Sequence, residues 1–302
     1  MFAGALAVLA PSAALASTEG GRAADWTWPP GIAIPLALTA ALYVLGIIRI
    51  RQSHRAAAVP TRSMVWFALG WFSLVLALDS PIHEIGEQLF WVHMTQHEIL
   101  MLVSAPLLVL GQPLVPFLYA LSSSWRKPIL NAGRSKAFRV SWNSVSAPLP
   151  AWLLSAAALW VWHIPWLFDR TLESDWIHAA QHTTFLSTAL LFWWPLVHRK
   201  QGMSSGAGVM YVFTTALHTS ILGALLSFTT RPWYAPYFKT APLWNLSAME
   251  DQQLGGLIMW IPAGTLLLVV ALILLIRSLN ESQLRWQYTN MAGIERLSGG
   301  AK

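Results

Sequence analysis

Long apolar segments constrain the fold of this chain more than any other feature of its sequence. The 302 residues are 55% hydrophobic and only 11% charged. A bilayer core about 30 Å thick is crossed by a helix of about 20 apolar residues, which satisfies all its backbone groups internally. We therefore predict an all-α, polytopic membrane helix bundle with seven transmembrane helices. The predicted helices cover residues 30–50, 64–79, 90–110, 147–167, 176–197, 209–229 and 254–276.

The predicted helices divide the chain into three parts. Residues 1–17 combine a short apolar core with small residues at its end, a pattern that indicates a possible signal peptide. Residues 30–277 form the predicted seven-helix transmembrane domain, and residues 278–302 form a predicted cytoplasmic tail.

A short apolar stretch at residues 113–121 follows the third predicted helix. Gly111, Pro113 and Pro116 interrupt it, and proline in a helix interior removes a hydrogen bond and bends or breaks the helix. We therefore expect a kinked or broken continuation of the third helix and not an eighth span.

Basic residues concentrate in the loops on one side of this arrangement. Fifteen of the 19 lysines and arginines fall there, and the positive-inside rule assigns that side to the cytoplasm. The N-terminus is then outside and the C-terminus cytoplasmic. The net charge of +6 thus reports membrane orientation, and we expect membrane lipid and no nucleic acid as a partner. The fifteen are Arg49, Arg51, Arg55, Arg62, Arg126, Lys127, Arg134, Lys136, Arg139, Arg199, Lys200, Arg277, Arg285, Arg296 and Lys302.

Two pairs of histidines four residues apart lie within the apolar helices. They are His93 and His97 in the third helix and His178 and His182 in the fifth. On a helix this spacing places both rings on one face, with Cβ atoms about 6 Å apart. Both helices start at the outer surface, so the pairs lie at matching depth, and His163 reaches the same level at the end of the fourth helix. Ionisable side chains inside a membrane are costly, which makes these five residues functional candidates.

The chemistry of these candidates points to a metal. Imidazole suits copper, zinc, iron and nickel, and the absence of cysteine excludes thiolate ligands and disulfides. The alternative is that each ring hydrogen-bonds to a neighbouring helix and only fixes packing. Met94, Met101, Met249 and Met259 lie nearby, but methionine is common filler in apolar helices, so we interpret them as core. Glu98 either carries a proton or forms an interhelical hydrogen bond.

The remaining four histidines are not candidates on this interpretation. His54 and His198 fall in cytoplasmic loops among basic residues, His83 falls in the outer loop before the third helix, and His218 lies near the middle of the sixth. Enzyme motifs are also missing, because the sequence has no complete H-E-x-x-H, phosphate-binding loop or nucleophile elbow. We expect no enzymatic activity.

The start of the seventh helix carries a short polar motif. Asp251 is interpreted as the cap of its own helix. The step Gly255-Gly256 predicts a close approach by a neighbouring helix, because small residues let helix backbones come together in membranes.

The order of these motifs resembles the CtaG-like assembly factors of caa(3)-type cytochrome c oxidase, a polytopic family. The resemblance runs from about residue 79 to residue 260. The blocks that carry it are HMTQH at 93–97, APLLVLGQP at 105–113, WHIP at 162–165, His178, His182, FWWP at 192–195 and DQQLGG at 251–256.

The resemblance implies a multi-pass protein of the bacterial inner (plasma) membrane that helps to build an active haem–copper oxidase. It implies partners among cytochrome c oxidase subunits or other copper chaperones, and a role in copper supply or insertion. Our hypothesis is that His93, His97, His178 and His182 are copper ligands and that His163 is a fifth ligand or a positioning group. Two alternatives are a b-type haem held by one histidine from each helix pair and a proton- or ion-coupled transporter.

Overall fold

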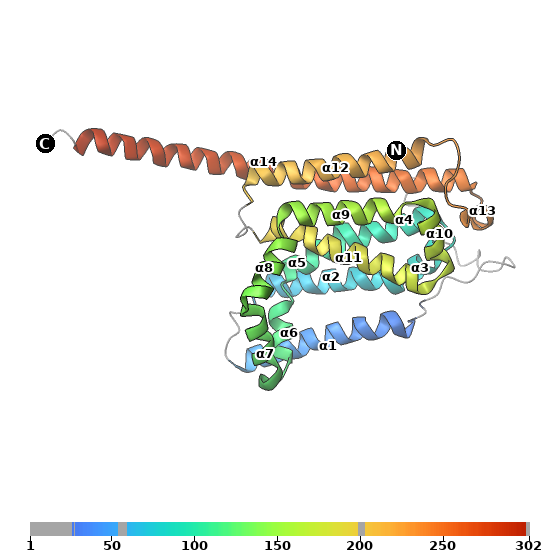
Figure 1. Cartoon of the computed structure of the whole chain (residues 1–302), viewed down its shortest axis with the longest axis horizontal. Helices are drawn as coiled ribbons and strands as arrows, with labels where there is room; N and C mark the ends of the chain where they lie inside the picture. Colours follow the sequence, from blue (N-terminus) through green and yellow to red (C-terminus); the bar gives the residue numbers. More distant parts are fainter. Residues whose placement is uncertain (1–25, 27, 54–58, 199–202, 300–302) are drawn as a thin grey trace.

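Every regular element in the described part of the chain is a helix (Figure 1). The computed structural model describes residues 26, 28–53, 59–198 and 203–299. The all-α prediction is confirmed for these residues, whereas the predicted signal peptide at residues 1–17 lies outside them.

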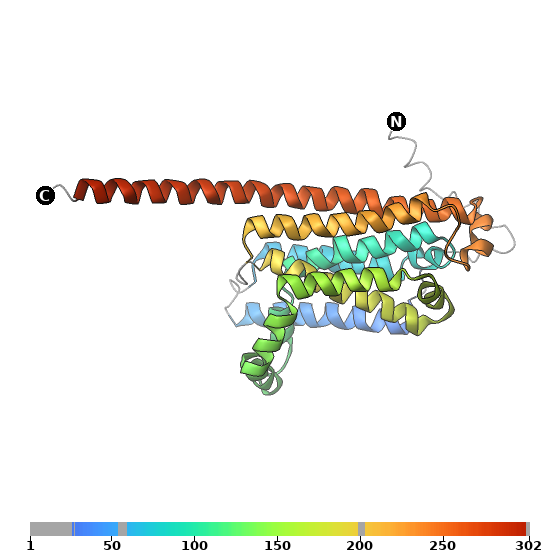
Figure 2. The ribbon, with the colours of Figure 1, turned by 45° about the horizontal axis from the view of Figure 1, so that its top comes forward.

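Long helices packed side by side form the body of the molecule, and short helices close its two ends (Figures 1 and 2). The long elements are α1 (Pro30–Gln52), α2 (Thr61–Asp79), the composite α4–η4–α5 (Phe90–Gly111), α9 (Pro148–Trp162), α11 (Asp175–Val197), α12 (Ser205–Phe228) and α14 (Ala248–Gly299). The short helices are α3 (Pro81–Gly86), α6 (Leu114–Ala120), α7 (Ser123–Arg134), α8 (Lys136–Val145), α10 (Pro165–Glu173), α13 (Tyr237–Thr240) and η6 (Ala241–Trp244).

Five of the described helices are long and apolar enough to cross a membrane, and the bent pair α8 and α9 makes a sixth candidate if it counts as one span. The 23-residue α11 packs against α9 and α5 but is not one of them. Its first half carries His178, Gln181 and His182, which lower its hydropathy. The chain is therefore a multi-pass helical membrane protein, and the count of seven spans stays a prediction.

The third predicted helix contains a wide turn. Its first part, α4 (Phe90–Glu98), continues through a π-helical segment, η4 (Ile99–Ser104), into α5 (Ala105–Gly111). The Ala105 N–H donates to the carbonyl of Leu100, five residues back. Pro106 has no N–H, so the helix cannot bond there in the ordinary way. The Nε1–H of Trp193 on α11 donates to the Met101 carbonyl at 2.9 Å, which satisfies one carbonyl of this segment.

Two predicted helix ends differ from the structure. The predicted helix 147–167 is wrong beyond Trp162, because His163 leaves helical geometry and Pro165 begins a separate helix, α10. A residue before proline disfavours the helical conformation, which explains the break. The predicted helix end at residue 276 is also wrong. No glycine or proline occurs between residues 265 and 292, and α14 continues to Gly299, far beyond the bundle (Figure 1).

The stretch after α5 does not span the bundle, as predicted. Gln112 adopts a left-handed conformation with φ of 48° and ends α5. The seven-residue α6 follows and packs against α1, after which α7 and α8 continue at the same end of the bundle (Figure 1). The helices α3, α10 and α13 lie at the opposite end.

Helices α12 and α14 run side by side along the bundle (Figure 2). A Cβ atom added at Gly256 would lie 2.5 Å from Ser227 Oγ and 2.7 Å from the Gly223 carbonyl oxygen on α12. Only glycine permits this approach, so the predicted role of the glycine step is confirmed at Gly256. At Gly255 an added Cβ would overlap the ring of Phe90 on α4.

Candidate metal centre

A carboxylate from the other end of the sequence fixes the start of α4. Leu89, which precedes α4, offers no side-chain cap. Asp251 of α14 replaces that cap, with Oδ2 accepting from the Phe90 N–H at 2.8 Å and Oδ1 accepting from the Trp91 N–H at 3.0 Å. The interpretation of Asp251 as the cap of its own helix is thus wrong. Its side chain holds the helix that carries His93.

The structure brings the two histidine pairs together at this end of the bundle. The ring centroids of His93 and His97 are 4.4 Å apart, and those of His178 and His182 are 4.3 Å apart. Across the helices, His93 and His178 lie 5.1 Å apart and nearly parallel, and His97 and His182 lie 5.3 Å apart. All four side chains are buried.

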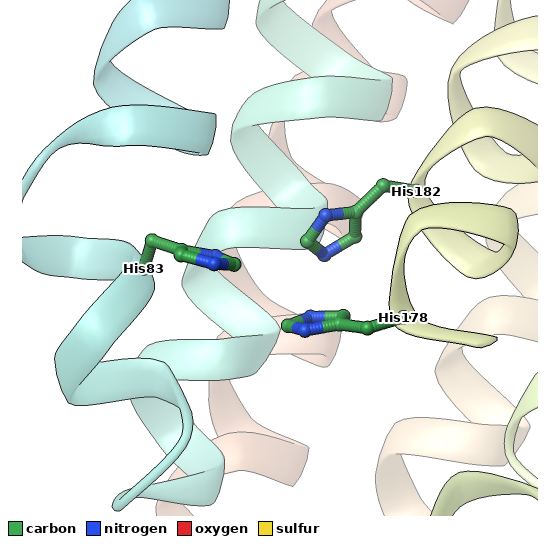
Figure 3. A group of neighbouring side chains, drawn as sticks. All are labelled: His83, His178 and His182. Atoms are coloured by element: carbon green, nitrogen blue, oxygen red, sulfur yellow. The ribbon is translucent and has the colours of Figure 1, made fainter. Parts of the chain in front are cut away.

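A fifth histidine, His83, joins the cluster although it is not among the sequence candidates. His83 of α3 stacks on His178 with centroids 5.1 Å apart (Figure 3). The hydropathy pattern does not mark it as a candidate, because it lies in a connection outside the apolar helices. Its position in the sequence, on the short helix α3 directly before the helix that carries His93, is the signal that could have found it.

Two groups of three histidines have ligand nitrogens close enough to share a metal ion. His83, His178 and His182 form the outer triad, and His93, His97 and His182 form the inner triad. In each triad the ligand atoms lie within 4.8 Å of one another. His182 belongs to both triads and therefore occupies the centre of the site.

His163 does not join either triad. Its Nδ1 lies 2.7 Å from the Leu159 carbonyl oxygen, which holds the ring against its own helix. Its centroid is 6.4 Å from that of Phe168 and 6.3 Å from that of Phe185. Both phenylalanines are fully buried beside the cluster. His163 is thus a neighbour of the cluster, in contact with its aromatic surround.

Polar partners orient the rings of two cluster members. Gln96 donates through Nε2 to the Ala77 carbonyl at 2.6 Å and lies 3.0 Å from His83 Nδ1. The Tyr237 hydroxyl donates to the Gly86 carbonyl at 3.0 Å and lies 3.3 Å from His93 Nδ1. Such outer partners fix ring orientation in metal sites.

The surroundings of His83 favour a neutral imidazole ring. Burial lowers the pKa of His83, against the opposing effect of the nearby Glu84, Asp79 and Asp175. Burial also raises the pKa of Tyr237, so its hydroxyl remains a donor at neutral pH. A neutral imidazole is the form that binds metal.

Several ring nitrogens of the cluster have no hydrogen-bond partner among the described residues and are available to bind a metal ion. Both ring nitrogens of His97, and Nε2 of His178 and His182, are buried without a hydrogen-bond partner among the described residues. Buried polar atoms nearly always have a partner, so each orphan requires an explanation. A metal ion at the triads would supply it, and the all-nitrogen donor set fits copper or zinc.

The Glu98 side chain lines a cavity separate from the two histidine triads. It lines this cavity of about 50 Å³ together with Met101, His218 and Met259. Its Oε2 and the His218 Nδ1 are buried without hydrogen-bond partners among the described residues. Glu98 belongs to neither triad.

The fold and the cluster define a polytopic helical membrane protein with a buried histidine centre at one end of its bundle. Residues 41–281 match the family model described as cytochrome c oxidase caa3 assembly factor (Caa3_CtaG). The chain belongs to this family, and the resemblance inferred from its sequence motifs is confirmed.

Similarity to curated proteins covers most of this chain. Uncharacterized proteins of Mycobacterium leprae (strain TN) and Mycobacterium bovis (strain ATCC BAA-935 / AF2122/97) are each 26% identical to it over 231 residues. The match covers 72% of this chain and 34% of each relative, so the chain spans about a third of the length of the curated relatives it matches. No solved structure shows a significant match.

Proposed function

We propose that this protein assists the assembly of caa3-type cytochrome c oxidase by holding copper, as cargo, at the five-histidine cluster. The ligands are drawn from His83, His93, His97, His178 and His182. Family membership supports the assembly role. The partners are oxidase subunits or other copper chaperones, and the protein has no enzymatic activity of its own.

The observation that carries the copper proposal is the pair of triads with orphan nitrogens. Packing alone would leave each ring hydrogen-bonded to a neighbouring helix, yet three of the five cluster rings keep buried nitrogens without partners among the described residues. A cluster without thiolates binds copper less tightly than a cysteine cage and releases it more readily. Release is what an assembly factor requires.

The geometry favours an ion over a porphyrin. A b-type haem would stand between one histidine of α4 and one of α11. The rings of His93 and His178 instead stack directly, with centroids 5.1 Å apart and planes inclined by 20°. That contact leaves no layer for a porphyrin between these two rings, which supports an ion at the cluster.

We also propose seven spans, with the N-terminus outside and the C-terminus in the cytoplasm of a bacterial inner membrane. Helix α11 is the added span, because its 23 residues pack within the bundle and its polar residues His178, Gln181 and His182 are buried. This orientation puts the histidine cluster on the outer side and most basic residues on the inner side.

The test is the metal content of the detergent-purified chain after copper loading and desalting. The double variant His93→Ala, His178→Ala breaks both triads. The matched control is His198→Ala, which removes a histidine beyond the end of α11 and away from the cluster. We expect near-stoichiometric copper in the parent and the control and none in a folded double variant.

Oxidase assembly is measured separately, as the activity of the oxidase in cells that carry each variant. Equal copper retention by the parent and the double variant would refute the triads as the site. Loss of copper without loss of oxidase assembly would refute copper delivery and leave the chain as a scaffold.

A further inference from the structure

A polar cavity lies at the opposite end of the bundle from the histidine cluster. Its volume is about 480 Å³, which is within the range of small-molecule sites. It lies where α1 ends and where α6 joins α7. The lining residues are Arg49, Ser53, Tyr119, Leu121, Ser122, Ser123 and Arg126. Two are arginines and none is acidic, so the cavity has a positive potential.

Contacts within the protein hold both guanidinium groups in place. Arg49 donates through Nη1 to the carbonyl of Ala120, at the end of α6. The Arg126 guanidinium lies over the ring of Tyr119, 4.8 Å from its centroid. Each group keeps further N–H donors, because a guanidinium carries five. The remaining donors match the oxygens of a phosphate group, which arginine binds through two parallel hydrogen bonds.

The start of α7 adds donors of the same kind. Ser122 precedes this 12-residue helix, and its side chain makes no capping hydrogen bond. The first turn of α7 contains no acidic residue. Its free N–H groups and the hydroxyls of Ser122 and Ser123 therefore supplement the arginines with neutral donors.

The surroundings of the cavity place it at a membrane surface. Trp125 on α7 and Phe138 on α8 are exposed, at 70% and 52%, on short helices that also carry basic residues. Amphipathic helices of this composition lie in the interface, with apolar side chains in the acyl boundary. The cavity opens beside them, at the level of lipid headgroups.

We propose that this cavity binds the phosphate of an anionic phospholipid from the inner leaflet. The phosphodiester lies between Arg49 and Arg126, and the acyl chains follow the apolar side chains of α7 and α8. Basic pockets at the cytoplasmic ends of membrane helices bind such headgroups. The site would anchor α6, α7 and α8 to the bilayer, independently of any metal at the other end.

The test is native mass spectrometry of the full-length chain with added phosphatidylglycerol or phosphatidylcholine. The variant Arg49→Gln, Arg126→Gln removes both lining charges. The matched control is Arg134→Gln, Arg139→Gln, which removes the same charge from α7 and α8 outside the cavity. We expect the lining variant to lose phosphatidylglycerol affinity by about tenfold or more and the control by less than about twofold. Phosphatidylcholine binding should not distinguish them.

Three results would overturn the proposal. Equal loss in both double variants would mean diffuse attraction to basic helices and no site. Displacement of phosphatidylglycerol by inorganic phosphate at about equal concentration would mean a free-phosphate site. If the glutamine variant fails to fold, Arg49→Lys, Arg126→Lys keeps the charge without the paired geometry, and unchanged lipid affinity in that variant would refute the paired-phosphate arrangement.

Discussion

Removal of the Asp251 carboxylate should loosen the helix that carries the inner triad. In the Asp251→Ala variant, the N–H groups of Phe90 and Trp91 lose their acceptors at 2.8 and 3.0 Å. Asp251 is fully buried, so water does not replace it readily. Each buried donor left without a partner costs about 1–3 kcal/mol. The predicted loss is therefore about 2–6 kcal/mol.

Two further variants refine this prediction. Asp251→Asn keeps one acceptor oxygen and sets an NH₂ group against the second N–H, so it should lose about half as much stability or slightly more. Asp175→Ala is the control, because Asp175 is an exposed acid in the first turn of α11 at the same end of the bundle. Its interaction with the helix dipole is worth no more than about 1 kcal/mol.

The assay is thermal unfolding in detergent together with copper retention. A change of 1 kcal/mol shifts the melting temperature of a chain of this size by roughly 2 °C, so Asp251→Ala should melt roughly 4–12 °C below the parent. A shift no larger than that of Asp175→Ala would refute the reasoning, because it would mean that the carboxylate does not hold α4.

Three other outcomes follow from the site and the packing. His182→Ala removes the residue common to both triads, so its copper affinity should fall by more than the 10- to 100-fold typical of outer partners. His163→Ala should stay within that range, and the opposite ranking in a copper titration would contradict the shared centre. Burial lowers the pKa of His83 from its ordinary value, so protonation should compete with the metal only below about pH 6.5, the unperturbed pKa of histidine. Copper content measured after desalting should therefore fall only in that more acidic range, and loss already above about pH 6.5 would argue against buried imidazole ligands. Gly256→Ala forces apart α12 and α14 and should cost about 1–3 kcal/mol in thermal unfolding. Gly264→Ala, whose added Cβ meets nothing within 4 Å, should be neutral or slightly stabilising, and an equal loss of stability in both variants would contradict the glycine contact.

The sequence predicted the helical architecture because hydropathy and proline placement act locally. The break after Gly111 followed from two prolines, and the approach of α12 to Gly256 followed from a residue without a side chain. Helix ends were less predictable. The end of α9 at His163 depends on the proline that follows, and the continuation of α14 to Gly299 depends on the lack of glycine and proline. A hydropathy pattern contains neither kind of information.

The site was predictable only where spacing within one helix revealed it. The four-residue separation of His178 and His182 predicts that both side chains lie on one face of the helix. His83 joins them through the fold-back of α3, and Asp251 reaches Phe90 across 161 positions of sequence. No local pattern contains either contact, because both depend on which helices become neighbours.

The π-helical segment Ile99–Ser104 makes the relative orientation of α4 and α5 depend on the number of residues between His97 and Gly111. Its wide turn holds one residue more than an α-helical turn, so the two ends of the composite helix differ in phase by about 100° from an uninterrupted helix. The first half aims His93 and His97 at α11, while the second half sets Gly111 so close to α2 that an added Cβ would lie 2.8 Å from the Phe67 backbone. Deletion of one residue within Ile99–Ser104 would remove this change of phase and turn one of these surfaces away from its partner. A substitution there leaves both directions unchanged, so it acts only through the packing of the replaced side chain.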